Sequence, residues 1–287
     1  MDTGNIVLNV KKSPLDTRDW IYDISLSNNV DKIKTILDLR GELMSVRNQG
    51  KQGTCYAQAA ACMKELQEKK DYGLNEHLSP QFFYNNRDNL YDDNKDNDEG
   101  MFGRNVMKLL KEMGICTEQQ YPYGLIETKD KITEGIYLSA NRHKIKGYAR
   151  ITSLNGLKTA LNNNGVCLIA FPVYNYDREL WKQKPNDTFQ GGHAMAVVGY
   201  LEDCFIIRNS WGPYWGDAGY CYYYFKDWDA HWEAWTTVDM LEPTSPTSPT
   251  SPTSPTSPTF PTPQPKPHPK NNCVKYILSL LKDLTHR

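Results

Sequence analysis

Three residues that together could attack a carbonyl group lie far apart in the chain, at Cys55, His193 and Asn209. A cysteine thiolate is a strong nucleophile, a histidine can take up a proton and return it, and an asparagine carbonyl can hold the imidazole in one orientation. Each of the three alone has an ordinary structural explanation, as a small buried thiol, a packed imidazole or a surface amide. Together they predict acyl-transfer chemistry, provided that folding brings them into contact.

The residues around Cys55 favour its thiolate form. Thr54 is a good helix N-cap, and Gly73, which comes after two lysines, is a good C-terminal stop. The sequence therefore predicts a helix over 54–72 with Cys55 in its first position, where the helix dipole stabilises a negative charge. Gln49 lies on the preceding glycine-containing loop, and its side-chain amide could donate to an oxyanion beside the backbone N–H of Cys55.

A predicted β-hairpin brings the other two residues together. The segments "GGHAMAVVGY" (191–200) and "CFIIRNSW" (204–211) both have the apolar and β-branched composition of strands, and a turn around 202–203 separates them. In such a hairpin His193 lies within a few residues of Asn209. Trp211 follows Asn209 by two positions, so its ring could shield the polar pair from water and border bound substrate.

These segments belong to a chain whose first half is predicted to be helical and whose second half is predicted to be stranded. The helical part includes 54–72 and 104–113, the latter ended by Gly114, and the stranded part also includes "GYCYYYF" (219–225). This order is typical of an α+β fold, and a cleft between the two halves is a natural place for a site.

The domain boundaries follow from changes in composition. We expect an N-terminal arm or short propeptide over 1–37 and a globular body over 38–242. From 243 to 269 proline recurs with serine and threonine, at every third residue in the repeated part, which predicts a semi-rigid polyproline II stalk. Residues 270–287 carry apolar residues at helical spacing and predict an amphipathic segment that could dock on a partner or on the body. A passive tail and a poorly ordered end stay open as alternatives.

Composition restricts the function classes. The net charge of −1 gives no general attraction to nucleic acid or to anionic membranes, and no apolar run reaches the length of a signal peptide or a membrane span. The seven cysteines include no Cys-x-x-Cys pair, which argues against a zinc framework and favours mostly reduced thiols. The acidic stretch 86–100 lacks calcium-loop spacing, so we expect a solvated loop there. No cofactor and no metal are predicted.

The three blocks around the candidate residues resemble those of the papain-like cysteine peptidases. These are "VRNQGKQGTCYAQ", "GGHAMAVVGY" and "IIRNSWGPYWGDAGY", in that order, with steps of 193 − 55 = 138 and 209 − 55 = 154 residues. The resemblance covers about 38–238. The pattern is cathepsin-like and is most similar to the bacterial, archaeal and large-virus members of the family, including giant-virus cathepsin-like proteins.

The resemblance implies a two-subdomain fold, with a helical half whose central helix starts at the nucleophile, a β-barrel-like sheet half, and a cleft between them. It gives Cys55 the role of nucleophile, His193 that of general acid and base, Asn209 that of orienting residue and Gln49 that of oxyanion donor. By the same resemblance, Gly100 pairs its backbone with extended substrate. Met101 and Ala194 form walls of the pocket for the P2 residue, the second before the scissile bond, and "KDWDAHWEAW" (226–235) supplies its floor. An apolar or mixed P2 preference follows.

Two departures from the family pattern bear on where and how the protein works. Gln52 stands where relatives usually carry a cysteine three residues before the nucleophile, so the usual secretory disulfide is missing. With no signal peptide, this predicts an intracellular, reducing location or packaging in a virion. Residues 1–37 are too few for the long helical prodomain of many relatives. The extended segment "SPLDTRDWIYD" (13–23) could still lie across the cleft as a propeptide, or it could simply brace the fold.

The function predicted from these observations is hydrolysis of polypeptides by a cysteine endopeptidase, through a Cys-His-Asn triad and an acyl-enzyme intermediate. Synthesis of the enzyme as a zymogen stays open. An exopeptidase is disfavoured because no inserted loop with paired histidines is present. Two alternatives stay open. One is another acyl transfer on the same triad, as in a transglutaminase or amidase, and the other is a binding or packaging protein that keeps the peptidase body for structural reasons.

Overall fold

The computed structural model describes residues 6–22, 33–87, 100–124 and 129–238. The chain divides into the units Met1–Leu241 and Glu242–Arg287, and the second unit lies outside the described residues. The predictions of a stalk over 243–269 and of an amphipathic segment over 270–287 therefore stay predictions. The same holds for most of the acidic stretch 86–100, of which only 86, 87 and 100 are described.

The described residues form both helices and strands, which confirms the α+β class. The α-helices are α1 (Cys55–Tyr72), α2 (Pro80–Asn85), α3 (Gly103–Glu112), α4 (Glu134–Ala140) and α5 (Leu154–Asn164). The strands are β1 (Leu37–Asp38), β2 (Tyr148–Ile151), β3 (Cys167–Val173), β4 (Gly191–Tyr200), β5 (Cys204–Arg208), β6 (Tyr220–Tyr224) and β7 (Glu233–Thr237). Short 3₁₀ turns cover Arg40–Glu42, Lys129–Lys131, Asn141–His143 and Phe225–Ala230. None of the helices in these ranges combines the length and apolar character that a membrane span needs.

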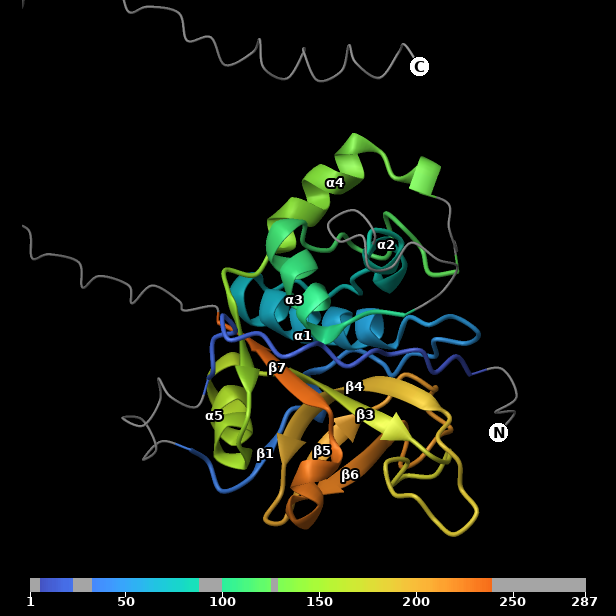
Figure 1. Cartoon of the computed structure of the whole chain (residues 1–287). Helices are drawn as coiled ribbons and strands as arrows, with labels where there is room; N and C mark the ends of the chain where they lie inside the picture. Colours follow the sequence, from blue (N-terminus) through green and yellow to red (C-terminus); the bar gives the residue numbers. More distant parts are fainter. Residues whose placement is uncertain (1–5, 23–32, 88–99, 125–128, 239–287) are drawn as a thin grey trace, which may run out of the picture. The chain divides into compact units, whose positions relative to one another are not determined.

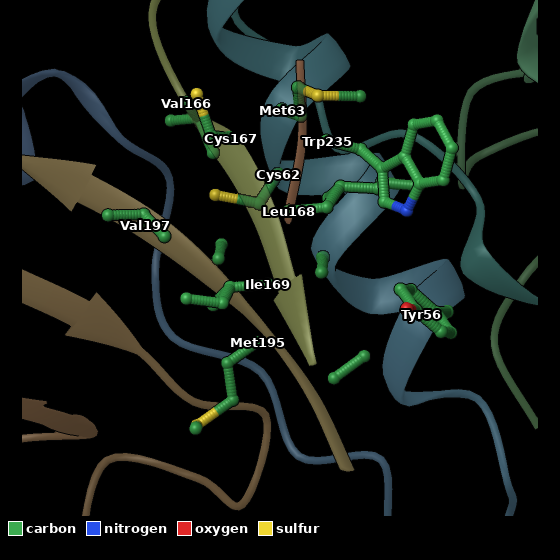
Figure 2. Close-up of a cluster of buried hydrophobic side chains, with 14 of the residues drawn as sticks. Tyr56, Cys62, Met63, Val166, Cys167, Leu168, Ile169, Met195, Val197 and Trp235 are labelled. Carbon is green, nitrogen blue, oxygen red and sulfur yellow. The ribbon is translucent and has the colours of Figure 1, made fainter. Parts of the chain in front are cut away.

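Helix α1 is the central element of the fold. Every residue from Cys55 to Glu68 is buried, and the small side chains of its first turns allow the sheet to approach closely. Figure 1 shows α1 between the other helices of the helical half and the sheet. In Figure 2, Tyr56, Cys62 and Met63 of α1 lie beside Leu168 and Ile169 of β3 and Trp235 of β7. The helix ends as predicted, with Gly73 in the left-handed conformation at φ 70°.

The sheet half is an antiparallel sheet with strand order β2-β7-β3-β4-β5-β6, and β1 pairs with β4. Strands β4 and β5 form the predicted hairpin, with Ala196 opposite Arg208. This register leaves His193 and Asn209 just beyond the last paired residues of the two strands. The prediction of the hairpin and of the proximity of these two residues is confirmed.

The N-terminal arm, residues 6–22, runs alongside both halves. Asn9 and Lys11 form isolated parallel bridges to Gly192 and Phe102, and the described residues of the arm form no continuous strand. The arm makes a further bridge from Ile21 to Arg150 of β2. In Figure 1 this blue segment crosses the view at the level where the helical half and the sheet half meet. Successive parts of the arm thus contact β4, the start of α3 and β2.

Candidate active site

Cys55 occupies the first position of α1, as the sequence predicts, and its side chain is fully buried. Thr54 is the N-cap residue, but the expectation that its side chain caps the helix is wrong. The Thr54 hydroxyl instead lies 2.7 Å from the hydroxyl of Tyr123, which in turn donates to the backbone oxygen of Gln49. The loop before Cys55 is therefore fixed from outside by Tyr123, and the helix dipole remains directed at the sulfur.

His193 and Asn209 form a buried hydrogen-bonded pair. The Nε2 of His193 lies 2.7 Å from Oδ1 of Asn209, and the backbone N–H of Ser210 donates to the same Oδ1 over 2.7 Å. Because that N–H needs an acceptor, the atom facing His193 must be the carbonyl oxygen, and Nε2 must carry the proton. The neutral imidazole then has its lone pair on Nδ1, which makes no hydrogen bond to any described residue.

Burial sets the protonation state of His193. The imidazole is fully buried, and this desolvation lowers its pKa to about 4, although the hydrogen bond to Asn209 acts in the opposite direction. The ring of Trp211 stacks on that of His193, with centroids 4.5 Å apart. The predicted shielding role of Trp211 agrees with this contact. At neutral pH the histidine is thus a neutral base with its free lone pair on Nδ1.

Gln49 is joined to the same network through Ser210, a residue that sequence reasoning missed. Oε1 of Gln49 accepts from the Ser210 hydroxyl over 2.7 Å, and the backbone N–H of Gln49 donates to the Ser210 carbonyl over 2.8 Å. These contacts direct Nε2 to the carbonyl oxygens of Gln52, at 3.0 Å, and Val7, at 3.5 Å. The position next to Asn209 is the only signal for Ser210 in the sequence.

Helix α1 and the β4–β5 hairpin bring the predicted residues together. One small internal cavity is lined both by Cys55 from α1 and by Asn209, together with Ala194, the neighbour of His193 on β4. No group of three or more acidic, histidine or cysteine side chains in the described ranges is arranged to hold a metal ion. What the arrangement offers is a thiol at a helix start, a neutral imidazole held by an amide, and a second amide on the preceding loop.

Residues 33–231 match the model of the family described as papain family cysteine protease. The chain belongs to the papain family of cysteine proteases. It is 27% identical, over 283 residues, to an uncharacterized peptidase C1-like protein of Acanthamoeba polyphaga mimivirus, with 85% of this chain and 91% of that one covered. A cathepsin L-like proteinase of Phaedon cochleariae is 30% identical over 189 residues, which are 63% of this chain and 56% of that relative.

The fold of this papain-family protease agrees with a solved structure. It resembles xylellain, a cysteine protease from Xylella fastidiosa, with a TM-score of 0.71 and 26% sequence identity over 80% of this chain and 95% of that one. The prediction of a papain-like fold with a helical half and a sheet half is therefore confirmed, as is the classification as a papain-like cysteine-type endopeptidase.

The N-terminal arm of this protease lies where the sequence predicts bound substrate. The backbone N–H of Val10 donates to the Gly192 carbonyl over 3.2 Å, and that of Lys11 donates to the Met101 carbonyl over 3.4 Å. The arm is therefore inserted between the start of β4 and the residues before α3. A Cβ on Gly100, whose φ is 75°, would lie 2.3 Å from the carbonyl oxygen of Asn9, so only glycine admits the arm here.

The part of the arm that occupies this position differs from the one expected. Residues 7–11 lie beside Gly100, Met101 and Gly192, whereas the segment 13–22 continues over α3 and β2. There Ser13 donates to Glu233, and Arg104 of α3 binds the Asp19 carboxylate through Nε at 2.8 Å and Nη2 at 2.6 Å. The described residues 13–22 thus agree with the hypothesis that this segment braces the fold, and it is the stretch 7–11, not 13–22, that lies beside Gly100.

Glu233 is the second residue that sequence reasoning missed, within the stretch 226–235 that was expected to supply the pocket floor. Ala194 is opposite Ala170 of β3, and Ala170 is opposite Glu233 of β7, so the three side chains lie on one face of the sheet. The carboxylate is buried, and its Oε1 accepts from Ser13, from the Tyr56 hydroxyl at 2.9 Å and from the Gly103 N–H at 3.3 Å. A buried carboxyl group therefore lies in line with Ala194, beside the expected P2 pocket.

Proposed function

We propose that this papain-family protease hydrolyses peptide bonds through Cys55, His193 and Asn209, with a covalent acyl-enzyme intermediate. The observation that carries the proposal is the 2.7 Å contact from His193 Nε2 to Asn209 Oδ1, because it leaves the basic Nδ1 of the imidazole for the thiol. A thiol at a helix N-terminus and a base held in one tautomer are the two parts that activate a cysteine nucleophile.

In the proposed reaction, Nδ1 of His193 takes the proton of Cys55, and the thiolate attacks the peptide carbonyl carbon. The oxyanion accepts hydrogen bonds from Nε2 of Gln49 and from the backbone N–H of Cys55. The imidazolium then gives its proton to the departing amine, which leaves the acyl group on sulfur. Water, deprotonated by His193, hydrolyses the thioester and restores the thiol. The contact of Gln49 Nε2 with the Val7 carbonyl supports the ability of this amide to receive a peptide oxygen.

We also propose that the chain is made as a zymogen in which the arm occludes the substrate side. Backbone atoms of Val10 and Lys11 use the same Gly192 and Met101 carbonyls that an extended substrate would need. Beyond this region the arm is anchored by the buried pair of Asp19 with Arg104. Activation then requires release or cleavage of residues 7–11.

Two measurements test these proposals. Labelling with the thiol-reactive epoxide E-64, followed by mass mapping, should modify Cys55 in the activated wild type and not in His193→Ala. Absence of labelling in the activated wild type would contradict the peptidase. For the zymogen, the N-terminus of the purified wild type should be shorter than that of Cys55→Ala. Intact N-termini in both would argue against self-processing.

The same experiment separates the alternatives. A binding or packaging protein with an inert peptidase body would leave Cys55 unlabelled under conditions in which the arm is removed. A transglutaminase or amidase would be labelled but would not cleave an extended peptide substrate. Cleavage of a protein substrate with new N-termini, measured by mass spectrometry, supports the endopeptidase over both.

A further inference from the structure

The cavity behind Cys55 is lined by one face of α1. Cys55, Gln58, Ala59 and Cys62 contribute from α1 at spacings of three, four and seven residues, which place them along one side of the helix. The opposite wall consists of the β4 residues 194–196 and of 208–210 at the end of β5. The volume open to the centre of a water molecule is about 20 Å³. The cavity therefore lies in the protein interior, with Cys55 on one wall and Asn209 on the opposite wall.

The lining of this cavity contains polar atoms without partners in the described part of the chain. The side chain of Gln58 is 5% exposed, and neither its Oε1 nor its Nε2 makes a hydrogen bond there. The same is true of Nη1 of Arg47 and of Nδ2 of Asn209, two further lining residues. Buried amide groups are rarely left unsatisfied, because their desolvation is not compensated.

We propose that Gln58 holds one ordered water molecule in this cavity, and that this water positions the Asn209 amide for its hydrogen bond to His193. The inference rests on the proposed function of His193. A cavity needs only about 10–15 Å³ of such volume to hold one water with two to four polar partners. Gln58 is thereby a positioning residue for the reaction, acting through the water and Asn209.

The chemistry of Asn209 explains why such a support matters. Its Oδ1 already accepts from His193 and from the Ser210 N–H. The stability of this amide orientation therefore depends on whether its Nδ2 has a hydrogen-bond acceptor. A water that accepts from Nδ2 of Asn209 and exchanges hydrogen bonds with both amide atoms of Gln58 satisfies three otherwise unsatisfied atoms at once. It also disfavours a flip of the Asn209 amide, which would present Nδ2 to the protonated Nε2 of His193.

The charged residues of the lining argue for water rather than for an anion. Nη2 of Arg47 binds the Glu65 carboxylate at 2.7 Å, and Arg208 donates to the backbone oxygens of Met44 and Ser45. Although Nη1 of Arg47 has no partner in the described part of the chain, the charge of Arg47 already pairs with Glu65, and Arg208 already has two acceptors. A neutral molecule that both donates and accepts matches the Gln58 amide, whereas an anion could only accept.

The test compares two Gln-to-Met substitutions in α1 of the full chain after activation. Gln58→Met replaces this lining side chain with one of similar volume that lacks both amide atoms. Gln67→Met is the control, because Gln67 is another buried α1 glutamine whose amide donates to Thr237 and does not line the cavity. The pH profile of kcat/KM and the separate kcat and KM values are measured for a peptide substrate.

We expect Gln58→Met to lower kcat by about three- to tenfold, the effect of one lost hydrogen bond, with KM unchanged. Weaker support of Asn209 destabilises the imidazolium, so the acid limb of the kcat/KM profile, which reports protonation of the neutral His193, should move to lower pH. Gln67→Met should keep the wild-type profile. Identical profiles for the two variants would overturn the positioning role.

A crystal structure of the arm-containing protein tests the water independently of activity. We expect density for one water within hydrogen-bonding distance of the Gln58 amide in the wild type, and its loss in Gln58→Met. A cavity without density, or an anomalous signal there after a bromide soak, would overturn the water. If instead the activated wild type shows no E-64 labelling while the water is present, the proposed function fails and the water site stands.

Discussion

The Nε2–H of His193 donates to the side-chain oxygen of Asn209 across 2.7 Å, in a site from which solvent is excluded by the stacked ring of Trp211. Truncation in Asn209→Ala leaves the buried Nε2–H without an acceptor and no longer favours the tautomer with a basic Nδ1. We expect kcat to fall by about 100-fold, with a much smaller change in KM. Asn164→Ala is the control, because Asn164 donates to Thr236 and Thr237, away from His193. Steady-state kinetics of both activated variants check this.

Gln49 and Gln52 offer a matched pair for the oxyanion role. Gln49→Ala removes the amide whose Nε2 faces the Val7 carbonyl, and we expect kcat to fall by about 100-fold. Gln52 contacts Gln49 through backbone atoms, its carbonyl accepting from Gln49 Nε2 and its N–H donating to the Gln49 carbonyl, so Gln52→Ala should change kcat by less than about threefold. Equal losses in the two variants would indicate that the loop, and not the Gln49 amide, stabilises the transition state.

Release of the arm should depend on Asp19. Its carboxylate and the Arg104 guanidinium are 6% and 10% exposed, and breaking such a buried pair is strongly destabilising for the element that carries it. We expect Asp19→Asn to raise the rate of E-64 labelling of the unprocessed chain by about tenfold or more. Asp16→Asn is the control, because Asp16 pairs only with the exposed Arg18. Similar labelling rates in both variants would contradict an anchoring role for Asp19.

The buried carboxylate of Glu233 should influence substrate choice. Its Oε2 makes no hydrogen bond to the described residues, so in the activated enzyme the carboxylate can pair with a basic P2 side chain that reaches along the Ala194 face. We expect Glu233→Gln to lower the ratio of kcat/KM for arginine over leucine at P2 by about tenfold. The ratio within one variant cancels any general loss of activity. An unchanged ratio would place the P2 side chain away from Glu233.

The fully buried His193 and the half-buried His231 predict how stability depends on pH. Desolvation lowers the pKa of both His193 and His231 to about 4, whereas an unfolded histidine titrates near 6.5. Between these values the unfolded state binds more protons, so the free energy of unfolding decreases as the pH falls from about 6.5 to about 4.

The variant His231→Gln isolates this effect, because glutamine keeps a hydrogen-bonding side chain beside Tyr223 and does not titrate. By linkage, the loss of stability of the wild type between pH 7 and pH 5 should exceed that of the variant by up to about 2 kcal/mol. Urea unfolding at the two pH values measures this difference. An equal loss in both proteins would mean that His231 is as accessible to protons in the folded as in the unfolded state.

Local signals in the sequence were sufficient for the parts of the site that short-range geometry decides. The N-cap position of Thr54 and the stop at Gly73 placed Cys55 at the start of a helix, and the strand composition and turn in 191–211 placed His193 beside Asn209. Such predictions hold because helix ends and hairpins follow from interactions between residues that are neighbours along the chain. Thr54 shows the limit, since its hydroxyl contacts Tyr123 and not the helix.

By itself, then, the sequence determined the chemistry, the α+β class and the four residues Gln49, Cys55, His193 and Asn209 as the candidate site. Only the tertiary structure decided that Ser210 holds Gln49, that Glu233 lies in line with Ala194, that residues 7–11 lie beside Gly100 and Gly192, and that Gln58 lines a cavity with Asn209. Ser13 and Glu233 are 220 residues apart, and a contact at that separation leaves no periodic or local pattern. It depends on how α1, the arm and the sheet pack together, because packing is set by the shape and burial of whole surfaces.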